Sequence, residues 1–117
     1  TALYQVVTKG VMVQMTAMSI TGKFGEDIQR FSIFLLEHNL AHVIATDTHS
    51  IFYRPPLLRE AVKIAEDIIG KERANDLVIT MPAAIIDGRE VSLPPPVEFQ
   101  QKKVNTWLQR LAPFLKT

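Results

Sequence analysis

Asp47 and His49 are the residues whose types and spacing best fit metal chemistry in this sequence. They close an apolar run, HVIATDTH, that is expected to form a strand over residues 42–48. Residues two apart on a strand point to the same face, so the carboxylate and the imidazole would project together. This donor pair suits manganese, iron or zinc better than calcium. The alternative is a carboxylate that orients a surface histidine without metal, since Asp-x-His is a short and common pattern.

Arg54 is the second residue whose position suggests a site. It precedes Pro55, which presets the first turn of a following helix and biases Arg54 towards an extended backbone. A cation at a helix N-terminus has the unfavourable sign for the helix dipole. The placement makes sense if an anion lies between the guanidinium and the free N–H groups of the helix. The alternatives are a solvated arginine or an arginine paired with Asp47.

Polar residues near the first strand complete the candidate substrate-binding set. Gln14 and Thr16 interrupt one face of an apolar strand and could face the same cavity. Lys23 follows in a glycine-bearing loop that could approach a phosphate, although a solvated loop lysine is the simpler interpretation. Of the other histidines, His42 is interpreted as a structural residue with a backbone partner, and His38 as a helix-end donor.

The elements that would position these residues alternate between helix and strand. Apolar spacing, glycine stops and proline starts define them. They are expected as a helix ending at Gly10, a strand over 11–17, a loop over 18–27, a helix over 26–38, the strand over 42–48, a helix over 57–69, short helices within 72–79 and 80–88, a short strand over 89–93, and a last helix after Pro94–Pro96.

This order predicts an α/β fold with parallel strands. The strands over 11–17 and 42–48 are expected to be parallel neighbours. Two clear strands cannot make a complete sheet, and the chain opens inside a helix without an initiator methionine. We therefore expect a piece of a larger fold, with residues 1–93 in its main body and residues 94–117 forming a proline break and a C-terminal helix.

Bulk composition excludes several classes of protein. The chain has 117 residues, of which 47% are hydrophobic and 21% charged, and this balance argues against disorder. A formal net charge of +1 implies no strong attraction to nucleic acid or to an anionic membrane. No run approaches the roughly 20 apolar residues that span a bilayer, and no signal peptide is visible. The absence of cysteine excludes disulfides and thiolate metal sites and fits a reducing cytoplasm.

Three stretches, VQMTAMSITGKFG, HVIATDTHS and YRPPLLREA, resemble the C-terminal part of the bacterial PHP-type tyrosine phosphatases. These are metal-dependent enzymes of capsule and exopolysaccharide operons, in a superfamily named for polymerase and histidinol phosphatase. The similarity covers roughly residues 3–96, and the order of the motifs is more specific than any one of them. The chain departs from the pattern of this family at Met18, where relatives often have glycine, and at Ser50, where asparagine is frequent.

The resemblance implies a distorted, TIM-like barrel of seven strand–helix units, with metal ions, usually Mn²⁺, at the C-terminal ends of the strands. By this likeness Asp47 and His49 form the last metal-binding motif. Arg54 matches a phosphate-binding arginine. The substrate would be a phosphotyrosine on a tyrosine autokinase that controls polysaccharide export.

The family's early motifs, rich in histidine and glutamate, have no counterpart among these residues, so this segment is expected to need the remainder of the barrel. Two other functions stay open at this point: a PHP phosphoesterase for a small phosphorylated metabolite, and a non-catalytic partner-binding module with a vestigial metal motif.

Overall fold

A computed structural model describes residues 2–47 and 58–99 of the chain. Within these two ranges helices and strands alternate before a final helical run. The elements are α1 (Ala2–Thr8), β1 (Gln14–Thr16), α2 (Ala17–Thr21), α3 (Glu26–Glu37), β2 (Val43–Ala45), α4 (Arg59–Ile69), α5 (Lys71–Asn75), the π-helical turn η1 (Asp76–Thr80) and α6 (Met81–Ile86). None of the described helices is long and apolar enough to cross a membrane.

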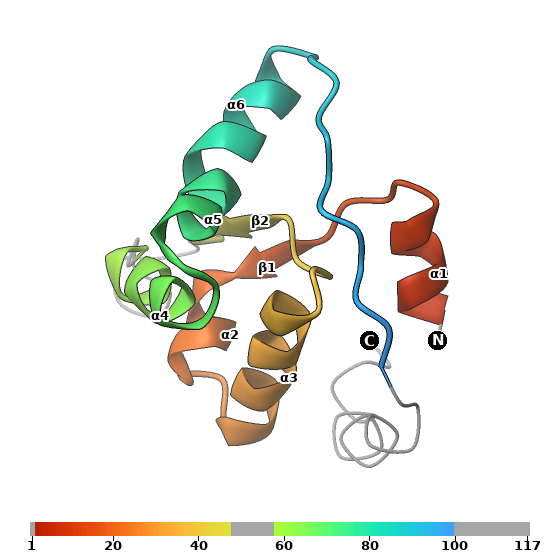
Figure 1. Cartoon of the computed structure of the whole chain (residues 1–117). Helices are drawn as coiled ribbons and strands as arrows, with labels where there is room; N and C mark the ends of the chain where they lie inside the picture. The colour runs from red at the N-terminus through yellow and green to blue at the C-terminus, as the bar shows by residue number, and fades with distance from the viewer. Residues whose placement is uncertain (1, 48–57, 100–117) are drawn as a thin grey trace.

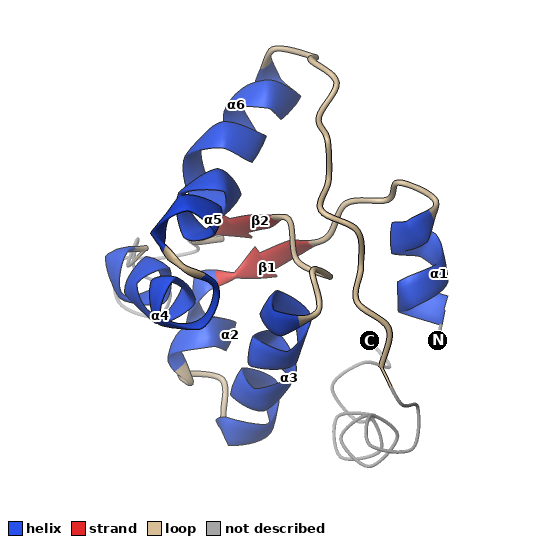
Figure 2. Ribbon diagram, in the orientation of Figure 1, coloured by secondary structure: helices blue, strands red, loops and turns tan. Residues whose placement is uncertain are grey.

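The two strands are parallel neighbours, as the sequence predicts. Met15 of β1 lies opposite Ile44 of β2 in the hydrogen-bonded register. Figures 1 and 2 show the pair at the centre of the molecule, with α2, α3 and α4 below it and the run from α5 to α6 leaving it at the upper left. The mixed α/β class is confirmed. Helices α2 and α3 lie between the two strands in the sequence and form the crossover that a parallel pair requires.

Several expected boundaries are wrong, and each has a local physical reason. Each strand has three residues rather than seven, because α2 begins directly after β1 and because Asp47 adopts a left-handed backbone with φ of 49°. The expected loop over 18–27 contains α2, which is stabilised by the complete burial of Ile20. The expected strand over 89–93 is absent, since no described strand lies beside it to complete a ladder.

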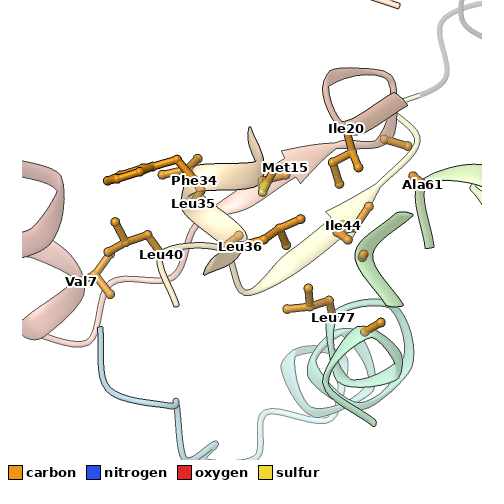
Figure 3. Packing of buried hydrophobic residues seen from close by; sticks show 14 residues of the cluster. Val7, Met15, Ile20, Phe34, Leu35, Leu36, Leu40, Ile44, Ala61 and Leu77 are labelled. Carbon is orange, nitrogen blue, oxygen red and sulfur yellow. The ribbon is translucent and has the colours of Figure 1, made fainter. Parts of the chain in front are cut away.

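One apolar cluster holds the described elements together. Met15 and Ile44 point into it from the sheet, and Figure 3 shows Leu36 of α3 and Leu77 of η1 on the same side of the sheet as Ile44. Ala61 and Ala65 of α4 are fully buried, and their small side chains let that helix approach closely. The cluster therefore covers one face of the sheet, and the opposite face carries the alternate residues of each strand.

His42 fastens the start of the strand pair. Its ring Nδ1 accepts a hydrogen bond from the Val13 N–H at 2.9 Å, and its own backbone N–H donates to the Val13 oxygen at 2.9 Å. Because Nδ1 accepts, the neutral ring carries its proton on Nε2, which is buried and has no hydrogen-bond partner among residues 2–47 and 58–99. The prediction of a structural histidine with a backbone partner is confirmed.

Residues 89–99, the C-terminal arm, return across the molecule and tie α1 to the end of α3. The Val97 N–H donates to the His38 oxygen at 2.8 Å, and Asn39 Nδ2 donates to the Pro95 oxygen at 2.9 Å. Phe99 meets the rings of Phe34 and Tyr4 edge-on, with centroids 5.0 and 6.2 Å away. Figure 1 shows the arm running down beside α1. His38 also bonds the Phe34 oxygen through Nδ1, as expected of a helix-end donor.

Mild acid should weaken this fold through His42. Burial, and secondly the Arg73 charge, hold the pKa of His42 below its ordinary value of 6.5. As the pH falls below 6.5, the unfolded chain therefore binds a proton before the folded chain does, and the free energy of unfolding decreases until the folded pKa is passed. The limiting slope is about 1.4 kcal/mol per pH unit for one proton.

Urea unfolding at about pH 7.5 and about pH 5.5 measures this effect. The control is His42→Asn, whose amide oxygen can still accept from Val13 but does not titrate. The wild type should lose more stability than the variant over this interval. Equal losses would assign the pH dependence to other groups.

Candidate functional site

Asp47 lies at the C-terminal edge of the parallel strand pair. The strands end opposite each other, with Thr16 in register with Ala45, and Asp47 follows two residues after β2. Its side chain is exposed. Open parallel sheets and barrels place their ligands at this edge, and the role of Asp47 as a metal ligand there stays a prediction.

The backbone of Asp47 alters the geometric basis of that prediction. A φ of 49° is left-handed, a conformation that Asp and Asn tolerate better than most residues. The strand rule for residues two apart therefore does not extend from Asp47 to His49. His49 and Arg54 lie outside the described residues, so a shared cavity for Asp47 and His49 and the phosphate contact of Arg54 stay predictions.

Gln14 and Thr16 share the sheet face that points away from the apolar cluster. Gln14 lies opposite Val43, and Met15, which points the other way, is 5% exposed. Gln14 is exposed and Thr16 is half-buried. Thr16 ends β1 at the edge itself, whereas Gln14 lies two residues before it. A substrate at the edge would thus meet Thr16 before Gln14.

Lys23 follows α2, a short helix that extends beyond the C-terminal end of β1 (Figure 1). Gly22 caps this helix with φ of 89°, and the Lys23 N–H donates to the Met18 oxygen at 3.2 Å. Gln29 fixes the loop from α3, because its Nε2 donates to the Ile20 oxygen at 2.9 Å. Lys23 itself is exposed, so its ammonium is available to an anion at this end of the sheet.

Helix α2 is the part of the site that sequence reasoning missed. The signal was present, since a glycine at position 22 closes a five-residue run that includes Ile20. Thr21 of α2, which precedes Gly22, uses its hydroxyl within the helix. Thr21 Oγ1 lies 3.3 Å from the Met18 oxygen, to which it donates, so this hydroxyl is directed to its own helix.

Within residues 2–47 and 58–99, no three His, Asp or Glu side chains gather closely enough to hold a metal ion. Asp47 fits the role of a single oxygen ligand, because it is an exposed carboxylate at the strand edge. The other ligands of any ion there would come from outside the described residues. This part of the chain thus contributes one donor to a possible metal centre.

The sequence of this chain matches a known protein family and several named relatives. The family described as "Capsular polysaccharide synthesis, CpsB/CapC" matches residues 1–87. The putative tyrosine-protein phosphatase CapC of Staphylococcus aureus is 41% identical over 58 residues, which are 50% of this chain and 23% of that protein. The tyrosine-protein phosphatase YwqE of Bacillus subtilis is 39% identical over 70 residues, or 60% of this chain and 28% of that protein.

A solved structure gives a similar result. It comes from work on YwqE of Bacillus subtilis and CpsB of Streptococcus pneumoniae, described as unique metal-dependent tyrosine phosphatases. It matches with a TM-score of 0.79 and 30% identity, covering 85% of this chain and 40% of the solved one. The chain thus spans less than half the length of these relatives.

The left-handed backbone at Asp47 predicts an order of stability between two variants. Asp47→Gly and Asp47→Ala both remove the carboxylate, but only alanine places a Cβ in the left-handed conformation. We expect Asp47→Ala to be less stable than Asp47→Gly by about 1 kcal/mol in urea unfolding. An alanine variant as stable as the glycine variant would show that this backbone conformation is not retained in solution.

Proposed function

Because the chain belongs to the CpsB/CapC family of capsular polysaccharide synthesis, we propose that it is part of a metal-dependent protein-tyrosine phosphatase. In this proposal it supplies the C-terminal strand–helix units of a distorted, seven-unit PHP barrel. The supporting observation is the parallel β1–β2 pair, which carries Asp47 at its C-terminal edge. The structural match over 40% of a metal-dependent tyrosine phosphatase adds to it.

The proposed division places residues 1–93 in the barrel and residues 94–117 in a proline break and a last helix. Described contacts cross this boundary, since Val97 bonds His38 and Phe99 packs on Phe34. The first residues after the break would therefore brace the outside of the barrel.

Each candidate residue has a distinct task in the proposed reaction. When bound, a divalent ion, Mn²⁺ or another transition metal, would activate water and offset phosphate charge. Asp47 and His49 would hold that ion through a carboxylate oxygen and a ring nitrogen. Arg54 would bind the phosphate oxygens, more tightly as charge spreads over them in the transition state.

Lys23 and Gln14 would act on the substrate rather than on the metal. The exposed Lys23 ammonium would attract the phosphorylated segment towards the edge of the sheet. Gln14, which projects on the sheet face away from the apolar cluster, would donate its amide N–H to an oxygen of the substrate. The proposed substrate is the phosphotyrosine of a tyrosine autokinase that controls polysaccharide export, and the proposed location of the phosphatase is the cytoplasm. The tyrosine-phosphatase names of the relatives support the choice of phosphotyrosine.

Arg54→Ala tests the proposed reaction in the complete protein. Losing a contact that strengthens in the transition state should lower kcat for a phosphotyrosyl peptide by about 10²–10³. Metal content, measured by elemental analysis, should not change. The matched control is Arg30→Ala, which removes an arginine paired on the surface with Glu26. Unchanged kinetics would identify Arg54 as a solvated residue, and turnover of small phosphomonoesters alone would favour a metabolite phosphatase.

The 117-residue chain prepared alone should behave as an incomplete barrel. Open edges of buried parallel strands are templates for further pairing, so we expect self-association in size-exclusion chromatography with light scattering. Phosphatase activity with added Mn²⁺ should be close to background because Asp47 and His49 are too few ligands. A monomer with metal-dependent turnover would contradict the proposal that this chain is a part.

A further inference from the structure

The helical run from α5 through η1 to α6 is apolar on two sides. One side belongs to the core, where Leu77 and Ala84 are 4% and 3% exposed. The other side carries Ile79 and Ile86, which are 60% and 84% exposed. Each isoleucine follows a core residue by two positions, and two positions on a helix turn a side chain through roughly 200°. The isoleucines therefore point away from the core and from β2, which η1 contacts.

The exposed side continues between the two isoleucines without a charge. Pro82 and Ala83 lie there, both half-buried, and no charged side chain occurs in residues 78–86. Each isoleucine is three or four residues from these two, so the four side chains form one stripe, called the outer stripe below. Figure 1 shows α6 leading away from the strand pair. An uncharged, exposed helix side of this kind indicates a contact surface.

The outer stripe is symmetric about its midpoint, between Pro82 and Ala83. Ile79 lies three residues before Pro82, and Ile86 lies three residues after Ala83. A two-fold axis through this midpoint, perpendicular to the helix, would set Ile79 of each copy against Ile86 of the other. The small side chain of Ala83 lies at the crossing point and permits close approach of the two helices.

Two charges lie beyond the ends of the stripe, at equal distances from its midpoint. Asp76 is three residues before Ile79, and Arg89 is three residues after Ile86. Arg89 Nη2 lies 3.3 Å from Asp87 Oδ2, but the two side chains are 61% and 59% exposed. Such an exposed pair contributes little and can be exchanged for another. The same two-fold axis would bring Asp76 of each copy to Arg89 of the other, so opposite charges meet at both ends.

We propose that the outer stripe is the interface of a two-fold symmetric dimer, in which α6 packs antiparallel to α6 of a second copy. A two-fold contact uses the same surface on both copies and is the commonest symmetry of soluble oligomers. This one buries four isoleucines and joins two pairs of opposite charge.

The stripe does not fit the other candidate partners. Without a charge, it offers nothing to attract a phosphopeptide or an anionic membrane. Strand–helix units that extend the sheet would lie beside β2, on the other side of the helical run. The dimer goes beyond the phosphatase proposal and does not depend on it.

A cysteine at the centre of the stripe tests the dimer, because the chain has no cysteine of its own. In the Ala83→Cys chain the two thiols should face each other across the axis, and a short bifunctional thiol reagent should join two chains. The matched control is Val97→Cys on the arm, where the native side chain is 46% exposed. It should give little cross-linked product in denaturing electrophoresis. Equal cross-linking of the two chains would overturn the proposal, and so would no cross-linking at position 83.

Two further substitutions in the Ala83→Cys chain test the apolar part of the stripe. Ile79→Gln/Ile86→Gln should raise the protein concentration for half-maximal cross-linking by at least about 100-fold, because four isoleucines leave the contact. Helix content by circular dichroism should not change, since both side chains are exposed in the single chain. Association through open strand edges does not involve these side chains, so an unchanged concentration would assign the cross-link to those edges and overturn the dimer.

Exchanging the end charges distinguishes a second copy from any other partner. Asp76→Arg alone, or Arg89→Asp alone, sets like charges against each other and should raise the same concentration about 10-fold. Asp76→Arg/Arg89→Asp restores opposite charges only if the facing surface belongs to the same chain, so its concentration should return to that of the Ala83→Cys parent. A double variant as weak as either single variant would assign the stripe to a different partner and overturn the dimer.

Discussion

The pairing of β1 with β2 is the contact on which the remaining structure depends. It is only three residues long on each side, and a histidine ring extends it by taking the Val13 N–H that no backbone carbonyl of β2 reaches. Because the pair is parallel, both C-terminal ends fall on one edge, and the residues that could do chemistry follow from it. The arrangement is unfavourable at one atom, because the second ring nitrogen of His42 is buried with no hydrogen-bond partner among the described residues, which costs about 1–3 kcal/mol.

Sequence patterns predicted those parts of the fold that local chemistry determines. The helix over 26–38 and the stop at Gly70 were readable because apolar spacing and glycine act within one or two turns. For helix α2 the sequence offers only the glycine stop at position 22, because its five residues are stabilised by burial of Ile20 and by Gln29 from another helix. The strand lengths were also overestimated. The sequence pattern continues through Asp47, but the backbone there is left-handed and no longer extended.

The candidate site follows the same division. The edge position of Asp47 could be predicted from strand order, since parallel strands end together. Its backbone conformation could not, because residue identity permits a positive φ at Asp without requiring it. Lys23 and Gln14 were selected by residue type alone. The structure shows that Thr16 lies at the C-terminal edge of the strand pair, whereas Gln14 lies two residues before that edge.

The arm has a consequence for the way the chain is made. Phe99 meets Tyr4, a residue 95 positions earlier, and Asn39 bonds Pro95 across 56 positions. At a synthesis rate of roughly 5–20 residues per second, α1 leaves the ribosome on the order of ten seconds before its aromatic partner exists. During that interval α1 lacks the contact between Tyr4 and Phe99. The arm therefore fastens α1 only some time after that helix has been synthesised.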